Sequence, residues 1–220
     1  MSARVIPARA GARAAAAAAV LAVSLVAGCG GHSVEPTPAA STAPADPTDP
    51  AAHMRTVLID PGHNGGNDPK QMAKKVPDGR GHTKPCNTTG TSTDAGYPEH
   101  LFTYYVAARV RALLIANGIN VVMTRTNDTG VGPCVDARGK QAAEANADAV
   151  VSIHADGAPP NGQGFHVIYS KPPLNAAQGA PSISLATALR DALRGAGFPE
   201  STYAGKNGLI GRSDLAGLNL

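Results

Sequence analysis

The chain has 220 residues, of which 43% are apolar and 16% charged, enough for one domain with a hydrophobic core plus terminal segments. Its net charge is +3, but three arginines lie before residue 30, in a segment that we expect to be removed. The remainder is near neutral, lacks tryptophan and has few aromatic residues. This composition gives no electrostatic support to a nucleic-acid partner.

Residues 1–29 have the pattern of an export signal, because three arginines precede an apolar run over residues 14–27 and small residues follow. The run is shorter than the roughly 20 apolar residues of a membrane span, so we expect no transmembrane helix in the mature protein. Two processing routes fit. Residues 26–29 read VAGC and resemble a bacterial lipobox, which would put a lipid anchor on Cys29, whereas ordinary cleavage near Ala27 would release the chain. Both routes predict an exported protein of the cell envelope, periplasm or extracellular space.

Residues 30–54 are rich in Pro, Ala, Ser, Thr and Asp. Such a segment cannot bury enough apolar surface to fold, so we expect a disordered tether. The folded domain is expected over residues 55–220, and it contains no internal repeat.

Within that domain, short apolar runs alternate with helical patterns. Residues 56–60 form an apolar, β-branched run that ends at Pro-Gly, which predicts a buried strand before a long loop over residues 61–97. A helix is expected over residues 98–117, with Pro at its start and Gly118 just past its end. The later elements expected are strands over residues 119–124, 149–153 and 165–169 and helices over residues 135–147 and 183–196. The alternation predicts an α/β fold, in which helices flank a mainly parallel sheet.

Three polar residues lie near the carboxyl ends of predicted strands or at the start of a predicted helix. His63 comes soon after the first strand, His154 ends the third strand, and Glu99 lies in the first turn of a helix. The carboxyl ends of parallel strands share one edge of a sheet, and the helices that join the strands begin at that edge. The topology therefore predicts that the three side chains meet on one rim.

The helix pattern places Glu99 on a buried face, since apolar residues follow it at helical spacing: Phe102, Val106, Val110 and Leu113. A buried carboxylate without a partner is costly, so it needs a cation, backbone N–H groups or a proton. Two histidines and one carboxylate are typical of catalytic zinc. Separate structural roles, such as helix capping by Glu99, stay open. His82 and His100 are the other imidazoles that could take part.

Cys86 and Cys134 remain if Cys29 is lipidated or lost, in a compartment that permits disulfides. A bridge would tie the long loop to the segment before a later helix and would stabilise the fold by about 4 kcal/mol on chain-entropy arguments. The alternatives are a free thiol or a metal ligand. Neither cysteine lies in a C-x-x-C motif, so we expect the disulfide.

Three segments together resemble a known family in order and spacing. VLIDPGHNGG at residues 57–66, the helix and strand at residues 98–125, and VVSIHADG at residues 150–157 closely resemble zinc-dependent N-acetylmuramoyl-L-alanine amidases of the Amidase_3 type. The resemblance covers roughly residues 56–220. It implies a phosphorylase/hydrolase-like α/β domain that binds one Zn²⁺ through the residues matching the family's ligands, His63, Glu99 and His154.

The resemblance also implies a reaction, the hydrolysis of the amide between N-acetylmuramic acid and the L-alanine of the peptidoglycan stem peptide. Zinc would lower the pKa of its bound water to about 7, and a carboxylate base would move the proton. As hypotheses, Asp60 and Asp156 orient His63 and His154 by hydrogen bonds to their rings. Turn capping is the alternative for both carboxylates.

The chain departs from the family at its C-terminal end. The family places its general-base glutamate in a strand after a segment like residues 214–220, so no catalytic base is expected within the chain and the glutamate is expected beyond Leu220. The C-terminal strand and helix are expected to be missing, and Glu200 lies in the wrong context to substitute. We therefore expect a chain of this form to bind zinc but to turn over substrate poorly or not at all. The leading interpretation is a metalloamidase or an incomplete sequence of one. The alternatives are a catalytically impaired zinc-containing peptidoglycan-binding protein and another zinc hydrolase, such as a carboxypeptidase or deacetylase.

Overall fold

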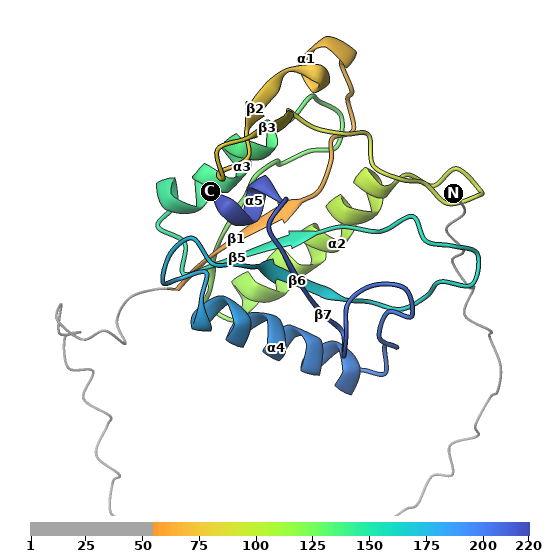
Figure 1. Cartoon of the computed structure of the whole chain (residues 1–220), viewed down its shortest axis with the longest axis vertical. Coiled ribbons are helices and arrows are strands. Elements are labelled where there is room, and N and C mark those ends of the chain that lie inside the picture. The colour runs from red at the N-terminus through yellow and green to blue at the C-terminus, as the bar shows by residue number, and fades with distance from the viewer. Residues whose placement is uncertain (1–54) are drawn as a thin grey trace, which may run out of the picture. The chain divides into compact units, whose positions relative to one another are not determined.

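The computed structural model describes residues 55–220 (Figure 1). The expected export signal, the lipobox at Cys29 and the tether over residues 30–54 lie outside the described residues. Among residues 55–220, no helix has both the length and the apolar character that a bilayer crossing requires.

The central sheet has three parallel strands. They are β1 (Thr56–Pro61), β4 (Asn120–Met123) and β5 (Ala149–Ile153), in the order β4-β1-β5. Leu58 of β1 lies opposite residues of both neighbouring strands and has 0% of its surface exposed. The apolar sequence of β1 is thus explained by its central position, since a strand covered on both faces offers no solvent side.

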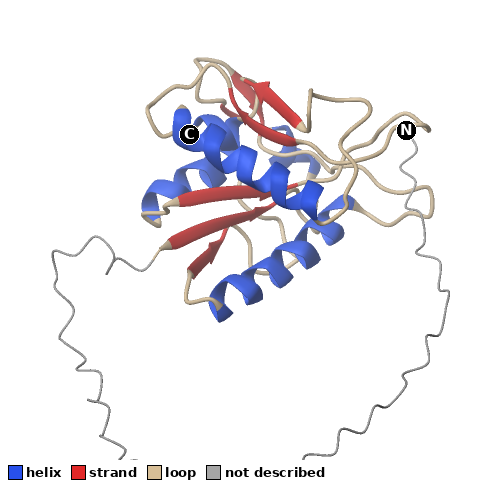
Figure 2. Cartoon of the chain, turned by 90° about the horizontal axis from the view of Figure 1, so that it is seen from below, coloured by secondary structure: helices blue, strands red, loops and turns tan. Residues whose placement is uncertain are grey.

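Helices flank these strands on both sides (Figure 2). The long helix α2 (Glu99–Ala116) contacts all three strands, and α3 (Val135–Glu144) contacts β1. The predicted α/β fold with a mainly parallel sheet is confirmed. The first strand, long helix and second strand were predicted to within one or two residues at each end.

A second parallel pair lies in the C-terminal part of the described chain. Strand β6 (Val167–Ser170) pairs with β7 (Leu209–Arg212), and α4 (Ala180–Gly195) packs against both. The short helix α5 (Ala216–Asn219) packs against α3. We predicted neither β7 nor α5. β7 has only two apolar residues before Gly211, and α5 is a single turn that contains Gly217, so neither shows a hydrophobic period.

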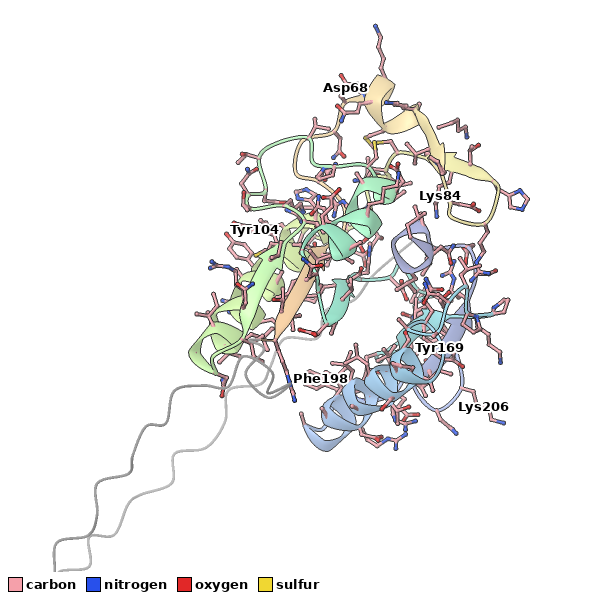
Figure 3. All side chains as sticks on the ribbon, turned by 90° about the vertical axis from the view of Figure 1, so that its left-hand side faces the viewer. Asp68, Lys84, Tyr104, Tyr169, Phe198 and Lys206 are labelled. Atoms are coloured by element: carbon pink, nitrogen blue, oxygen red, sulfur yellow. A yellow bond between two sulfur atoms is a disulfide. The ribbon has the colours of Figure 1, made fainter. Side chains whose placement is uncertain are left out.

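The loop expected over residues 61–97 contains short regular elements. Helix α1 (Pro69–Ala73) is followed by an antiparallel pair, β2 (Lys75–Pro77) and β3 (Thr83–Pro85). Just after β3, Cys86 is joined to Cys134 in the expected disulfide, the yellow bond in Figure 3. The bridge connects this loop to the residue that precedes α3.

The buried face of α2 differs from the predicted stripe. The buried residues are Glu99, Thr103 and Ala107, at a spacing of four, whereas Phe102 is 39% exposed and Leu113 66% exposed. Glu99 does point inward, but Phe102 and Leu113, two of the four residues predicted to share its buried face, are exposed. The helix is apolar on most sides, so its sequence does not specify which apolar row is covered.

Candidate metal centre

His63, Glu99 and His154 form one group at the rim of the sheet. Each offers a ligand atom, and these three atoms all lie within 4.8 Å of one another. His63 follows the end of β1, His154 follows β5, and Glu99 begins α2. The predicted convergence thus occurs where the carboxyl ends of two parallel strands meet a helix start.

The Glu99 carboxylate is the centre of the group. Its two oxygens lie 3.2 Å from Nε2 of His63 and 3.0 Å from Nδ1 of His154. The backbone N–H groups of Thr91 and Ala155 also donate to it, at 2.9 and 2.8 Å. Burial alone would raise the pKa of Glu99, but these four hydrogen bonds outweigh burial and hold its pKa far below the usual range. The side chain is therefore a buried, fully ionised carboxylate.

The imidazole of His63 has a defined orientation. Its Nδ1 lies 2.7 Å from the carbonyl oxygen of Thr88, so it donates a proton there and Nε2 faces Glu99. Burial would lower the pKa of His63, but the hydrogen bond and the charge of Glu99 raise it. The ring of His154 meets that of His63 edge to face, with centroids 4.9 Å apart, and half of the His154 side chain is exposed. Solvent therefore reaches the group from the His154 side.

Two glycines allow the backbone to approach these side chains closely. A Cβ at Gly62 would lie 2.2 Å from Cε1 of His154, and a Cβ at Gly90 would lie 2.8 Å from a carboxylate oxygen of Glu99. Neither position can accept a side chain unless the neighbouring His154 ring or Glu99 carboxylate moves. The backbone thus packs directly against the three candidate ligands.

The donor atoms fit a divalent transition metal. Two atoms bound to one tetrahedral zinc at about 2.0–2.1 Å lie roughly 3.3 Å apart. One ligand atom from each of the three side chains lies within 4.8 Å of the others, so small side-chain movements bring all three into this range. Calcium and magnesium prefer all-oxygen sites, so two imidazole donors disfavour them. The arrangement can hold an ion and leave a coordination position toward solvent.

Asp60 does not contact the ring of His63, contrary to the hypothesis that it orients that ring. Its carboxylate accepts hydrogen bonds from Thr124 at 2.6 Å, from Ser152 at 3.0 Å and from Arg138 at 2.7 Å. Asp60 lies in β1 and is only 7% exposed, so its side chain is held inside the sheet layer. The ring of His63 takes its orientation from a backbone carbonyl instead.

Asp156 likewise does not contact the ring of His154. It accepts a hydrogen bond from the hydroxyl of Tyr203 at 2.9 Å and lies 3.4 Å from Nε2 of His166. Burial and the bond to Asp156 raise the pKa of Tyr203 to about 12. Asp156 therefore links the segment after β5 to the start of β6 and the loop before β7.

The other residues that were considered as ligands or as a base make different contacts. His100 pairs with Asp128 at 2.8 Å, and His82 is exposed in the loop between β2 and β3. Glu200, which we did not expect to act as a base, pairs with Arg194 at 2.7 Å. Within residues 55–220, the group formed by the two predicted histidines and Glu99 is the one cluster suited to a metal ion.

Two buried arginines near the site were missed. Arg125 and Arg138 are 7% and 3% exposed, and both donate to the backbone around His63. Arg125 entered the sequence analysis only as the last residue of the segment 98–125, and Arg138 gave no signal because most arginines in helices are exposed. Buried arginine requires several acceptors in one place, which a sequence does not reveal.

The family relationship is shown by comparison with known proteins. The Amidase_3 model, described as N-acetylmuramoyl-L-alanine amidase, matches residues 57–208. An N-acetylmuramoyl-L-alanine amidase of Mycobacterium tuberculosis is 52% identical over 184 residues, which cover 84% of this chain and 75% of that protein.

Solved structures of amidases support the same family relationship. The amidase Ami1 of Mycobacterium smegmatis is 55% identical, with a TM-score of 0.74 over 75% of this chain and 76% of that one. Ami1 of Mycobacterium abscessus is 54% identical, with a TM-score of 0.73 over 75% and 77% of the two chains. An amidase of Clostridium difficile, 23% identical with a TM-score of 0.52 over 74% of this chain and 72% of that one, shares the fold. The chain therefore belongs to the Amidase_3 family of N-acetylmuramoyl-L-alanine amidases, enzymes of cell-wall peptidoglycan.

Proposed function

We propose that this chain is a zinc-dependent amidase, which cleaves the bond between N-acetylmuramic acid and L-alanine in peptidoglycan with zinc held by His63, Glu99 and His154. The observation that carries the proposal is the convergence of two imidazoles and one buried carboxylate within 4.8 Å. A His₂Glu set is a known catalytic zinc arrangement that leaves the fourth position for water.

Bound zinc would supply a water of lowered pKa and a Lewis acid for the scissile carbonyl. The residues of the chain supply orientation and charge. The Thr88 carbonyl selects the tautomer of His63 that leaves Nε2 free for a metal. The backbone donors at Thr91 and Ala155 keep Glu99 ionised without competing for a cation.

The activity is tested on purified muropeptides with intact stem peptides. The proposal predicts that the full chain releases stem peptide that begins with L-alanine, loses this activity after chelation and regains it with zinc, whereas the poor turnover expected from the sequence would leave the stem peptide attached. His63→Ala should be inactive, while His82→Ala, a matched change in an exposed loop, should resemble the wild type.

The products distinguish the alternatives. Mass spectrometry that finds a shortened stem or a deacetylated sugar would identify a carboxypeptidase or a deacetylase instead. A protein that binds zinc and muropeptide but leaves every bond intact would match the catalytically impaired peptidoglycan-binding protein considered from the sequence.

We also propose that the chain is exported, with residues 1–29 as its signal and residues 30–54 as a tether. The support is the charged, apolar and small-residue order of the first segment and the extracytoplasmic location of peptidoglycan. Mass spectrometry of the mature protein separates the two routes. A lipid on an N-terminal Cys29 indicates anchoring, and an unmodified N-terminus near Gly28 indicates release.

A further inference from the structure

The turn that carries His63 has an unusual set of hydrogen-bond donors. We call residues 61–64, which begin at the last residue of β1, the His63 turn. The side chains of Arg125 and Arg138 donate to the carbonyl oxygens of its first three residues, Pro61, Gly62 and His63. Two guanidinium groups thus supply donors to three successive buried backbone acceptors, of which the Gly62 carbonyl also accepts from the Thr103 hydroxyl at 2.8 Å.

Arg138, in α3, makes two of these four contacts and also reaches the side chains of Asp60 and Asn64. Its Nη1 donates to Asp60 at 2.7 Å and to the Pro61 carbonyl at 2.8 Å, and its Nη2 donates to the His63 carbonyl at 2.7 Å and to the side chain of Asn64. The planar fork of arginine can reach these acceptors at once, which a lysine ammonium cannot. The Asp60 carboxylate balances the buried charge of Arg138 and also accepts hydrogen bonds from Thr124 and Ser152.

Arg125, just after β4, approaches the same turn. Its Nε donates to the Pro61 carbonyl at 3.0 Å, and its Nη2 donates to the carbonyls of Gly62 at 3.2 Å and His100 at 2.8 Å. Its charge is paired with Asp128 at 2.8 Å. Because His100 directly follows Glu99, Arg125 connects the turn that carries one metal-site residue to the helix start that carries another.

The backbone of the His63 turn needs this support. His63 has φ of 62°, in the left-handed region that residues other than glycine adopt at a cost in energy. Such a conformation persists when the surrounding structure determines it, and it often marks a functional site. Gly62 is also held so close to His154 that a Cβ there would meet the ring at 2.2 Å. The conformation that places His63 against Glu99 therefore depends on contacts outside the turn.

We propose that Arg125 and Arg138 are positioning residues, which hold the His63 turn in the conformation that lets its imidazole share a metal ion with Glu99 and His154. This inference rests on the metal centre of the proposed function. Neither arginine would touch the ion or the substrate. Their effect on metal binding would pass through the backbone of the turn, as outer hydrogen-bond partners do in other metal sites.

The test compares two arginine-to-lysine changes in the full chain. Arg138→Lys keeps the charge beside Asp60 but cannot bridge the acceptors of the turn. Arg80→Lys is the matched control, because Arg80 donates to Asn219, Ser170 and the Pro172 carbonyl and makes no contact with the turn. Zinc affinity is measured by competition with a chromogenic chelator, and thermal stability is measured on the metal-free proteins.

Arg138→Lys is expected to bind zinc about 10- to 100-fold more weakly than the wild type, and Arg80→Lys is expected to bind it equally well. A merely structural role would lower the melting temperatures of both variants and leave both zinc affinities unchanged, which would overturn the inference. If Arg138→Lys does not fold, Arg125→Lys replaces it with the same expectation, since that change leaves the pair between Asp60 and Arg138 intact.

The two proposals fail in different ways. Wild-type protein that binds no zinc contradicts the proposed metal centre itself. Wild-type protein that binds zinc, together with an Arg138→Lys or Arg125→Lys variant of equal affinity, leaves the metal centre standing and contradicts the positioning role alone.

Discussion

Glu99 shows how a single buried charge can organise a site. It is 5% exposed, yet it is stable as a carboxylate because two backbone N–H groups and two imidazoles face its oxygens. In the absence of a metal these imidazole contacts require protons on the facing nitrogens. Metal binding must displace those protons, so metal affinity is expected to weaken as the pH falls.

Gly62→Ala tests the close approach of backbone and ligand at the residue scale. The new Cβ would lie 2.2 Å from the ring of His154, so either the ring or the turn must move. Zinc affinity measured by chelator competition should fall at least about 10-fold. Gly195→Ala is the control, because nothing lies within 4 Å of its added Cβ. Equal zinc affinity in both variants would show that the contact does not matter.

Asp60→Asn tests the buried pair with Arg138. Burial would raise the pKa of Asp60, but Arg138 and Thr124 together lower it below the ordinary value of 3.8. A carboxyl whose folded-state pKa is depressed stabilises the fold above its unfolded pKa, and this contribution is lost as the pH falls through the folded pKa. Asp60→Asn should therefore lower the free energy of unfolding at pH 7 by about 3 to 5 kcal/mol, with a smaller difference from wild type below pH 3.8.

Denaturant unfolding at several pH values measures this difference. Asp191→Asn, which removes a carboxylate that is 53% exposed and pairs with Arg190, should change stability by less than about 1 kcal/mol and serves as the control. A difference between wild type and Asp60→Asn that stays constant with pH would rule out the ionised pair as its source.

At the scale of elements, the disulfide fixes the loop whose Thr88 carbonyl and Thr91 N–H group contact residues of the candidate metal centre. Cys86 lies two residues before Thr88, whose carbonyl orients His63, and the Cys86 carbonyl accepts a hydrogen bond from Val135 at 2.9 Å. The bridge and this bond both join the loop to the start of α3, the helix that carries Arg138. The Thr88 carbonyl, which orients the His63 ring, and Arg138, which donates to the His63 turn, are therefore both tied to the start of α3.

Removal of the bridge by the double change of Cys86→Ser and Cys134→Ser should lower stability. The cysteines are 48 residues apart, and the chain-entropy estimate for such a loop is about 4 kcal/mol. Denaturant unfolding of the variant, compared with the oxidised wild type, measures the loss. A variant as stable as the oxidised wild type would mean that the bridge adds nothing to the fold.

The elements also show what a sequence can and cannot specify. β1 and α2 were predictable, since a β-branched run and a Pro-to-Gly pattern mark them. The buried row of α2 was not, because Phe102 and Ala107 are both apolar and only packing decides between them. β7 was not predictable either, because its two apolar residues are followed directly by Gly211 and show no period.

At the scale of the whole molecule, topology places the site. A central β1 with parallel partners on both sides brings the ends of two strands and the start of α2 to one rim. That convergence followed from the order of strands and helices, whereas the assignment of the three residues as ligands also rested on the resemblance to the family. The supporting arginines depend on contacts between residues more than 60 positions apart, such as Arg138 with His63, which no local pattern encodes.

Zinc content is the most direct test of the account. Wild-type protein and the variants His63→Ala, Glu99→Ala, His154→Ala and His100→Ala are dialysed against buffered zinc and analysed for bound metal. The wild type and His100→Ala should each hold one zinc per chain, and the other three variants should hold close to none. A full equivalent of zinc in any of those three folded variants would contradict the assignment of its residue as a ligand.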